Sequence, residues 1–213
     1  MTPECIPLGE SALLMRWGNA MDAELNRRLA AFARGLTVRP FAGFREAAPA
    51  YCSLAVHYEL TEATRFETVA ATLLTQWEQA VESTAVAGRT IEIPVRYGGE
   101  DLAAMSQAIG FTEEEIIAIH TGRSYSVYMM GFLPGFAYLG EVDERIAAPR
   151  HRIPRLRVEA GSVGIAGKQT GVYPLASPGG WQIIGRTDLA MFDPNAATPT
   201  LLEPGDAVRF VAI

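Results

Sequence analysis

The sequence predicts an α+β protein in which a small α/β domain, residues 1–86, precedes a β-barrel domain, residues 87–213. Three observations lead to this prediction. Strand and amphipathic-helix patterns alternate in the first part, the composition changes at the small, polar run Ser83–Arg89, and short strand patterns separated by glycine and proline follow Tyr125. The 213 residues are 49% hydrophobic and 20% charged, so the chain is able to bury a core in each part.

The N-terminal part begins with two short strands expected within Cys5–Trp17, on either side of the turn Gly9-Glu10-Ser11. A helix follows, and Asn19 is its expected N-cap. The apolar residues of this helix recur with the spacing of one face: Leu25, Leu29, Phe32, Ala33 and Leu36. Its arginines fall on the other side and are expected to face water.

A third strand is expected at Tyr51–Tyr58, where alternate residues are apolar. A second amphipathic helix is expected between Phe66 and Val81, because apolar residues recur there at helical spacing. The next strand is expected at Thr90–Val95, with Pro94 limiting its ladder hydrogen bonds. Up to Val95, with the two short strands of Cys5–Trp17 taken together, the predicted order is therefore strand, helix, strand, helix, strand.

Two short helices, Asp101–Ile109 and Thr112–His120, are expected before the barrel strands. The second opens on a capping-box pattern, in which Thr112 is followed three residues later by Glu115. After Tyr125 no helical pattern appears, and the short β-rich runs indicate a closed or nearly closed β structure.

The composition argues against several functional classes. The formal net charge of -6, without a basic tail, argues against nucleic acid as the main partner. The longest uncharged run, Ser124–Gly140, is interrupted by Pro134-Gly135, so no membrane span is expected, and no signal peptide is apparent. We therefore expect a cytoplasmic protein. Cys5 and Cys52 lack metal-ligand spacing and are expected to be reduced, buried thiols, so no metal site is predicted.

The stretch from Gly131 to Arg186 is unusual in its glycine content and its charge. It contains half of the 20 glycines and the only lysine, Lys168. Glycine loses the most conformational freedom on folding, so such density indicates that something approaches the backbone closely. The segment from Arg145 to Arg186 contains seven basic residues and a single acidic residue, Glu159. This reversal of the overall charge predicts a local surface for an anionic ligand.

Three motifs within this stretch are distinctive. They are Gly131-Phe132-Leu133-Pro134-Gly135-Phe136-Ala137-Tyr138-Leu139, Gly161-Ser162-Val163-Gly164-Ile165-Ala166-Gly167-Lys168-Gln169-Thr170-Gly171-Val172-Tyr173-Pro174, and Ser177-Pro178-Gly179-Gly180-Trp181. Through these motifs, and along essentially its whole length, the chain resembles the family described as allophanate hydrolase subunit 1, KipI or the B subunit of 5-oxoprolinase. The resemblance implies a ferredoxin-like N-terminal domain and a cyclophilin-like β-barrel.

The resemblance also implies a function. It implies one subunit of a bacterial complex that cleaves 5-oxo-L-proline to L-glutamate at the expense of ATP, with 5-oxoprolinase subunits A and C as partners. The latter is the partner related to allophanate hydrolase subunit 2. No P-loop or Rossmann pattern is present, so we expect the complex, rather than this chain alone, to bind ATP with Mg²⁺.

The chemistry of lactam opening suggests which side chains form the site. It needs cations for charged oxygens and polar groups that orient the amide. The candidate catalytic residues are His120, Lys168 and Gln169. The candidate substrate-binding residues are Arg150, Arg155, Thr170, Tyr173, Ser177, Trp181 and Arg186. His57 and His151 rank lower, and no Ser-His-Asp order or metal-ligand spacing appears.

Each candidate also has a structural interpretation. Arginine replaces lysine throughout the chain, so part of its abundance is compositional. Lys168 fits an exposed loop tip as well as a pocket, and His120 fits a helix C-cap as well as an acid–base role. The glycines at 161, 164, 167 and 171 fit tight turns between barrel strands as well as an anion-binding loop. Tyrosine and tryptophan are ordinary residues at the edge of a core.

Other functions remain open from the sequence. Members of the resembled family are also described as inhibitors of a sensor histidine kinase, which makes a protein-interaction module the second hypothesis. The substrate is 5-oxoproline, allophanate or a related urea-type amide. Prolyl isomerase activity rests on the resemblance of the barrel to cyclophilin alone, which is a weak argument for activity.

Overall fold

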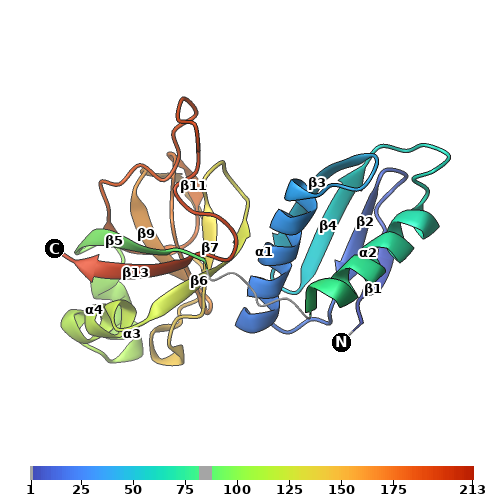
Figure 1. Ribbon diagram of the computed structural model, residues 1–213. Helices are drawn as coiled ribbons and strands as arrows, with labels where there is room; N and C mark the ends of the chain where they lie inside the picture. Colours follow the sequence, from blue (N-terminus) through green and yellow to red (C-terminus); the bar gives the residue numbers. More distant parts are fainter. Residues whose placement is uncertain (1, 82–87) are drawn as a thin grey trace. The chain divides into compact units, whose positions relative to one another are not determined.

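A computed structural model describes residues 2–81 and 88–213. The chain forms two compact units, Met1–Gly88 and Arg89–Ile213 (Figure 1). The predicted domain boundary after residue 86, and most of the predicted linker Ser83–Arg89, lie outside the described residues.

The first unit is an antiparallel sheet covered by two helices. Its strands are β1 (Glu4–Pro7), β2 (Ala12–Arg16), β3 (Phe44–Ala50) and β4 (Ser53–Tyr58), in the order β1-β2-β4-β3. Helices α1 (Ala23–Val38) and α2 (Phe66–Val81) pack on one face of this sheet (Figure 1). Leu13, Leu29, Leu54 and Leu73, one from each of β2, α1, β4 and α2, are completely buried at the centre of its core.

The strand order in this unit does not confirm the predicted ferredoxin-like arrangement. That arrangement runs β-α-β-β-α-β and so ends on a strand after the second helix. Here the chain runs β1-β2-α1-β3-β4-α2, and the edge position beside β2 is taken by β1, which precedes both helices. The coarser prediction of a small α/β unit is correct.

Local signals predict most elements of the first unit within a few residues. Helix α1 is capped by Asp22, whose carboxylate accepts the backbone N–H groups of Glu24 and Leu25, and not by the predicted Asn19. The predicted strand at Tyr51–Tyr58 begins only at Ser53, because Tyr51 lies in a turn with φ 49°. The preceding strand β3 was not predicted.

The second unit is a closed β-barrel. Its strands are β5 (Thr90–Tyr97), β6 (Ser124–Met130), β7 (Ala137–Gly140), β9 (Ser162–Ala166), β10 (Gln169–Val172), β12 (Gln182–Arg186) and β13 (Ala207–Ala212). They are paired in the order β6-β13-β5-β12-β9-β10-β7, and pairing of β7 with β6 closes the ring. The predicted barrel is therefore confirmed, whereas its likeness to cyclophilin remains a prediction.

Two helices, a 3-10 turn and a two-stranded sheet flank the barrel. Helices α3 (Leu102–Ile109) and α4 (Glu113–Thr121) follow β5, and α4 has the predicted capping box between Thr112 and Glu115. A single 3-10 turn, η1, covers Glu144–Ile146. Strands β8 (Arg155–Val158) and β11 (Ser177–Gly179) form a separate two-stranded sheet. The helices contribute Leu102 and Ile116 to the barrel core.

The structure also bears on the predictions about membrane spans and cysteines. No helix in residues 2–81 or 88–213 combines the length and apolar character that a membrane crossing requires. The thiols of Cys5 and Cys52 are free but partly exposed, so the prediction that they are buried is wrong. Both cysteines lie at the margin of the first unit, Cys5 on the edge strand β1 and Cys52 in the turn before β4.

Candidate functional site

An aromatic cluster packs against one side of the barrel, outside its main core. The ring of Phe136 lies edge-on to Trp181 and Tyr173, with centroid distances of 5.4 and 5.5 Å. All three side chains are at least 95% buried. Burial raises the pKa of the Tyr173 phenol, so that group stays protonated at neutral pH.

Two glycines form the surface on which this tryptophan lies. Gly164 and Gly171 face each other across β9 and β10. A Cβ atom on Gly164 would lie 3.1 Å from the Cβ of Trp181, and one on Gly171 would lie 3.3 Å from its Cζ3. The motif glycines at these positions therefore admit an aromatic side chain rather than an anion.

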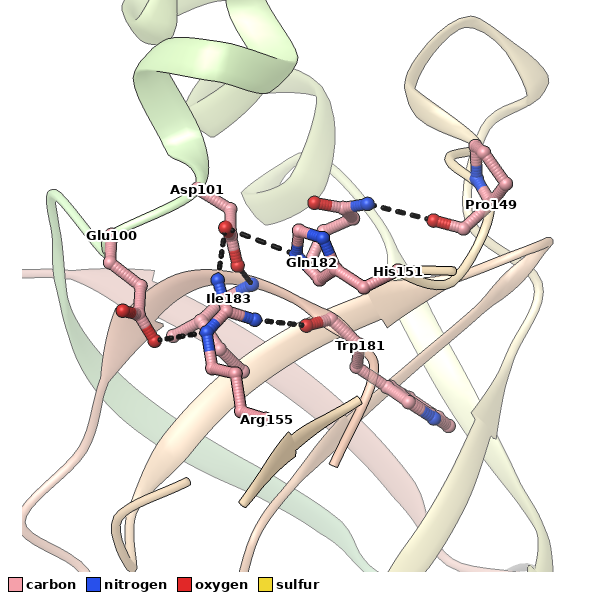
Figure 2. A network of polar contacts seen from close by, with 8 residues as sticks. All are labelled: Glu100, Asp101, Pro149, His151, Arg155, Trp181, Gln182 and Ile183. Atoms are coloured by element: carbon pink, nitrogen blue, oxygen red, sulfur yellow. Dashed lines mark hydrogen bonds and ion pairs between the residues drawn. The ribbon is translucent and has the colours of Figure 1, made fainter. Parts of the chain in front are cut away.

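A buried carboxylate organises the polar groups beside the cluster (Figure 2). Asp101, at the start of α3, accepts the backbone N–H of Ile183 at 2.6 Å through Oδ2. Its Oδ1 accepts a hydrogen bond from Arg155 Nη2. The same guanidinium reaches Glu100 Oε1 at 2.9 Å through Nε. Arg155, a predicted substrate-binding residue, is thus held by two carboxylates of its own chain.

His151 completes this network. Its Nε2 atom lies 3.1 Å from Asp101 Oδ1 (Figure 2), as an ion-pair contact rather than an aligned hydrogen bond. The side chain is 32% exposed, so the imidazole is accessible from outside. The contact places a carboxylate directly beside a partly exposed imidazole, which is a pair of groups that acid–base catalysis often uses. This arrangement suits proton transfer better than the environment of His120.

The segment that carries His151 is fixed to the aromatic cluster at several points. The His151 backbone N–H donates to Gly180 O at 2.7 Å, and Gln182 Nε2 donates to Pro149 O at 2.8 Å. The exposed Arg150 places its guanidinium carbon 5.9 Å from the Trp181 ring centroid. The candidate site therefore combines an exposed cation, an aromatic ring and a histidine beside a carboxylate, and it contains the predicted residues Arg150, Arg155 and Trp181. The predicted Tyr173 belongs to the same aromatic cluster as the tryptophan, and the predicted Ser177 lies opposite Val158 of that cluster in the two-stranded sheet.

Other predicted residues lie elsewhere in the barrel. His120 is completely buried, with Nδ1 2.7 Å from the Tyr97 hydroxyl and Nε2 2.9 Å from that of Thr170. Burial lowers the pKa of His120 to about 3, so the imidazole is neutral at physiological pH. Its ring stacks on Phe210 at 4.5 Å. His120 and Thr170 thus belong to the barrel core.

The remaining predicted residues are on the surface and do not converge on the site. Lys168 forms an exposed ion pair with Glu144, which raises the pKa of the lysine. The neighbouring Gln169 is half-buried at the start of β10. Arg186 is exposed at the end of β12, where it faces Arg96 across the strand pair. The candidate residues chosen from the sequence therefore do not all come together in one site.

The residues present do not fit a phosphate-binding loop. The backbone N–H of Gly161 donates to Tyr173 O at 2.7 Å, and that of Gly167 donates to Ala148 O at 2.6 Å. Gly164 and Gly171 pair within the sheet, and the ammonium group of Lys168 is held by Glu144. The groups that would hold an ATP phosphate here are already used inside the chain.

The described residues contain no group of three His, Cys, Asp or Glu side chains that is able to hold a metal ion. A hollow of about 400 Å³ lies in the first unit, between the C-terminal end of β2 and the turn before β4. It is lined by Leu14, Arg16, Gly18, Asn19, Met21, Ala50, Tyr51, Cys52 and Ser53. None of the predicted site residues lies in it.

Comparison with known proteins places this geometry in a family. The model of the carboxyltransferase domain, subdomain C and D, matches residues 3–202. The chain belongs to this family. It is 45% identical to the B subunit of 5-oxoprolinase from Bacillus subtilis over 218 aligned residues, which cover 97% of this chain and 91% of that protein. It is 40% identical to the corresponding B subunit from Escherichia coli O157:H7, covering 97% and 94%. The family resemblance predicted from the sequence is confirmed.

A solved structure agrees with this family membership and adds one fact. The crystal structure of TTHA0988 superposes with a TM-score of 0.82 and 39% sequence identity over 95% of this chain. The chain spans 39% of the length of TTHA0988, so in that protein the matching region is part of a longer polypeptide.

Sequence reasoning missed the residue that organises the site. The sequence marks Asp101 only as the beginning of a helix, and its partners Arg155 and Ile183 lie 54 and 82 residues further along the chain. His151 ranks below His120 in the sequence, although its position between Arg150 and Arg152 in the basic segment was a usable signal.

Proposed function

We propose that this chain is a subunit of a 5-oxoprolinase complex and contributes to the hydrolysis of 5-oxo-L-proline to L-glutamate. The observation that supports this most directly is the full-length match to the B subunit of 5-oxoprolinase, at 45% identity over 97% of the chain and 91% of the relative. The proposed companions are subunits A and C, and the proposed location is the cytoplasm.

The site suits recognition of this substrate. 5-Oxoproline carries a carboxylate on a five-membered lactam ring. In the proposal, the guanidinium of the exposed Arg150, whose carbon lies 5.9 Å from the Trp181 ring centroid, binds that carboxylate. The buried Asp101 holds Arg155 and lies 3.1 Å from His151, so neither side chain depends on the substrate for its position.

Hydrolysis breaks the bond between the lactam carbonyl carbon and the ring nitrogen. The hydroxyl group of water ends on the carbon, and the nitrogen gains a proton. His151 is the proposed residue that moves this proton, with Asp101 stabilising the charged imidazole. ATP coupling with Mg²⁺ is part of the proposal, but the nucleotide is assigned to a companion subunit, because the N–H groups of Gly161 and Gly167 and the ammonium group of Lys168 are already bonded within this chain.

The first experiment is reconstitution. The chain is co-purified with subunits A and C and supplied with ATP, Mg²⁺ and 5-oxoproline, and glutamate is quantified. We expect glutamate only from the complete mixture. Allophanate and urea derivatives serve as alternative substrates in parallel reactions. Turnover of one of these instead of 5-oxoproline would contradict the proposal.

The second experiment tests the residues. Arg150→Ala is expected to raise KM with little change in kcat, because it removes a contact to the unreacting carboxylate. His151→Gln is expected to lower kcat by about 10²-fold with little effect on KM. Arg209→Ala is the matched control, because Arg209 is an exposed barrel arginine paired with Glu92. Equal kinetics for all three variants would refute the site assignment.

A further inference from the structure

The basic segment beside the candidate site exposes two large aliphatic side chains. Leu156 is 93% exposed and Ile153 is 83% exposed, the highest values among the large hydrophobic residues of the described chain. Isolated exposed leucines are common on protein surfaces, but these two are three residues apart, so their Cα atoms are separated by no more than about 11 Å. We call this pair of neighbouring exposed side chains, Ile153 and Leu156, the apolar spot.

The two-stranded sheet is irregular where it carries Leu156. Along β8, Val158 is 2% exposed and lies opposite Ser177 of β11, which is 8% exposed. Regular alternation would turn Leu156 to the same side as Val158, but the register shifts between the Ser177–Val158 and Gly179–Arg155 pairs, so alternation does not hold across this segment. Leu156 lies on an outer face of the sheet, where its side chain is 93% exposed. Nothing in residues 2–81 or 88–213 covers this face to the extent of burying either aliphatic side chain.

Positive charge surrounds the apolar spot. The run Pro149–Val158 contains four arginines and no acid, in a chain whose net charge is -6. Arg155 is neutralised by Asp101 and Glu100, and Arg157 pairs with Glu159. Arg150 and Arg152 are exposed and have no carboxylate partner within the described part of the chain. A partner for this surface must therefore supply acidic groups around an apolar recess.

We propose that Ile153 and Leu156, with Arg150 and Arg152 around them, form the docking surface for a companion subunit whose own surface is an apolar recess edged by Asp and Glu. The inference rests on the proposed function for the identity of that companion. In TTHA0988 the matching region accounts for only 39% of the polypeptide, so this type of unit does occur attached to a larger partner. The docking segment also carries Arg150 and His151, so a subunit seated on it encloses the candidate site.

The test measures binding and turnover separately. Ile153→Ser/Leu156→Ser is compared with Val38→Ser, because Val38 is a similarly exposed aliphatic residue (78%) at the end of α1. The dissociation constant for the purified companion subunits is measured by calorimetry at low and high salt. We expect the double variant to bind at least about tenfold more weakly and the control to bind as the wild type does, with wild-type binding weakening as salt rises.

Two results would overturn the docking surface. One is binding of the double variant within twofold of the wild type. The other is a wild-type chain that forms a homodimer through these residues, seen as a monomer in the double variant, because the surface would then bind a second copy. Glutamate formation by the wild-type complex separates this inference from the proposed function. If the wild-type complex forms glutamate and the double variant binds the companion subunits as tightly as the wild type, only the docking surface is refuted. If the wild-type complex forms no glutamate but binding is lost in the double variant, only the proposed function is refuted.

Discussion

Asp101→Ala is the most informative single substitution in the barrel. The carboxylate is 7% exposed and binds two groups from distant parts of the chain, the backbone N–H of Ile183 at 2.6 Å and the guanidinium of Arg155. Alanine removes both acceptors and leaves the buried N–H group without a partner. The substitution therefore tests whether the network holds β12 and the basic segment in place.

The expected loss follows from the two bonds. A buried backbone N–H left without an acceptor costs about 1–3 kcal/mol. Loss of the Arg155 pair adds only about 1 kcal/mol, because that side chain is 24% exposed and keeps its contacts to Glu100 and the Trp181 carbonyl. We expect the free energy of unfolding of the barrel to fall by about 2–4 kcal/mol. Asp101→Asn keeps an acceptor for Ile183 and is expected to lose less.

The assay follows the barrel separately, because two compact units need not unfold together. Urea denaturation is monitored by hydrogen exchange of the peptide that contains β12, in which Ile183 lies. Asp188→Ala is the control, because it breaks an exposed ion pair with Arg96 and should cause no measurable loss. A free energy of unfolding for Asp101→Ala within about 0.5 kcal/mol of the wild type would show that the network is not structural.

Three further predictions concern the groups that lie outside the site. Because burial lowers the pKa of His120 to about 3, the unfolded chain binds more protons than the folded chain below about pH 6.5, and the free energy of unfolding should fall by about 2 kcal/mol from pH 7 to pH 5. His120→Gln should flatten this dependence in urea titrations and His57→Gln should not. Gly171→Ala should cost about 1–3 kcal/mol in the same titrations, since its Cβ would lie 2.9 Å from the Ala137 carbonyl oxygen, whereas Gly131→Ala should cost almost nothing. Lys168→Ala should leave the melting temperature and the turnover of the reconstituted complex unchanged, and a tenfold loss of turnover would return this lysine to the site.

The fold was predicted wherever local patterns agreed with the final environment. Short sequence patterns were enough for the Thr112 capping box, the amphipathic helices and the barrel strands separated by glycine. Strand β3 was missed because its sequence, Phe-Arg-Glu-Ala-Ala-Pro-Ala, has weak strand propensity and depends on pairing within the sheet, as with β4. The predicted start of β4 was two residues too early, because Tyr51 adopts a positive φ in a turn and tyrosine rarely does so.

The site was only partly predicted, for a different physical reason. Charge and aromatic content marked the region that contains the candidate site, with Arg150, Arg155 and Trp181. The choice between His120 and His151 depended on solvent access and on a carboxylate supplied from the start of α3, and neither is encoded near either histidine. Pairing of Arg155 with Asp101 joins positions 54 residues apart, so no local pattern was able to show that this arginine is already neutralised.

The glycine and arginine density that first marked this region has two different origins in the structure. Gly164 and Gly171 are required because Trp181 packs directly on their backbone, so the glycines create an aromatic platform instead of a phosphate cradle. Arg155 is used to fix that platform to α3, which leaves Arg150 and Arg152 as the two arginines of the run Pro149–Val158 that are available to something outside the chain. One of these lies over the tryptophan and the other beside Ile153 and Leu156. The unpaired arginines of this site therefore lie on the surface, next to exposed aliphatic side chains, and a companion subunit is needed to enclose the site. For this reason we expect activity from the assembled complex and none from the isolated chain.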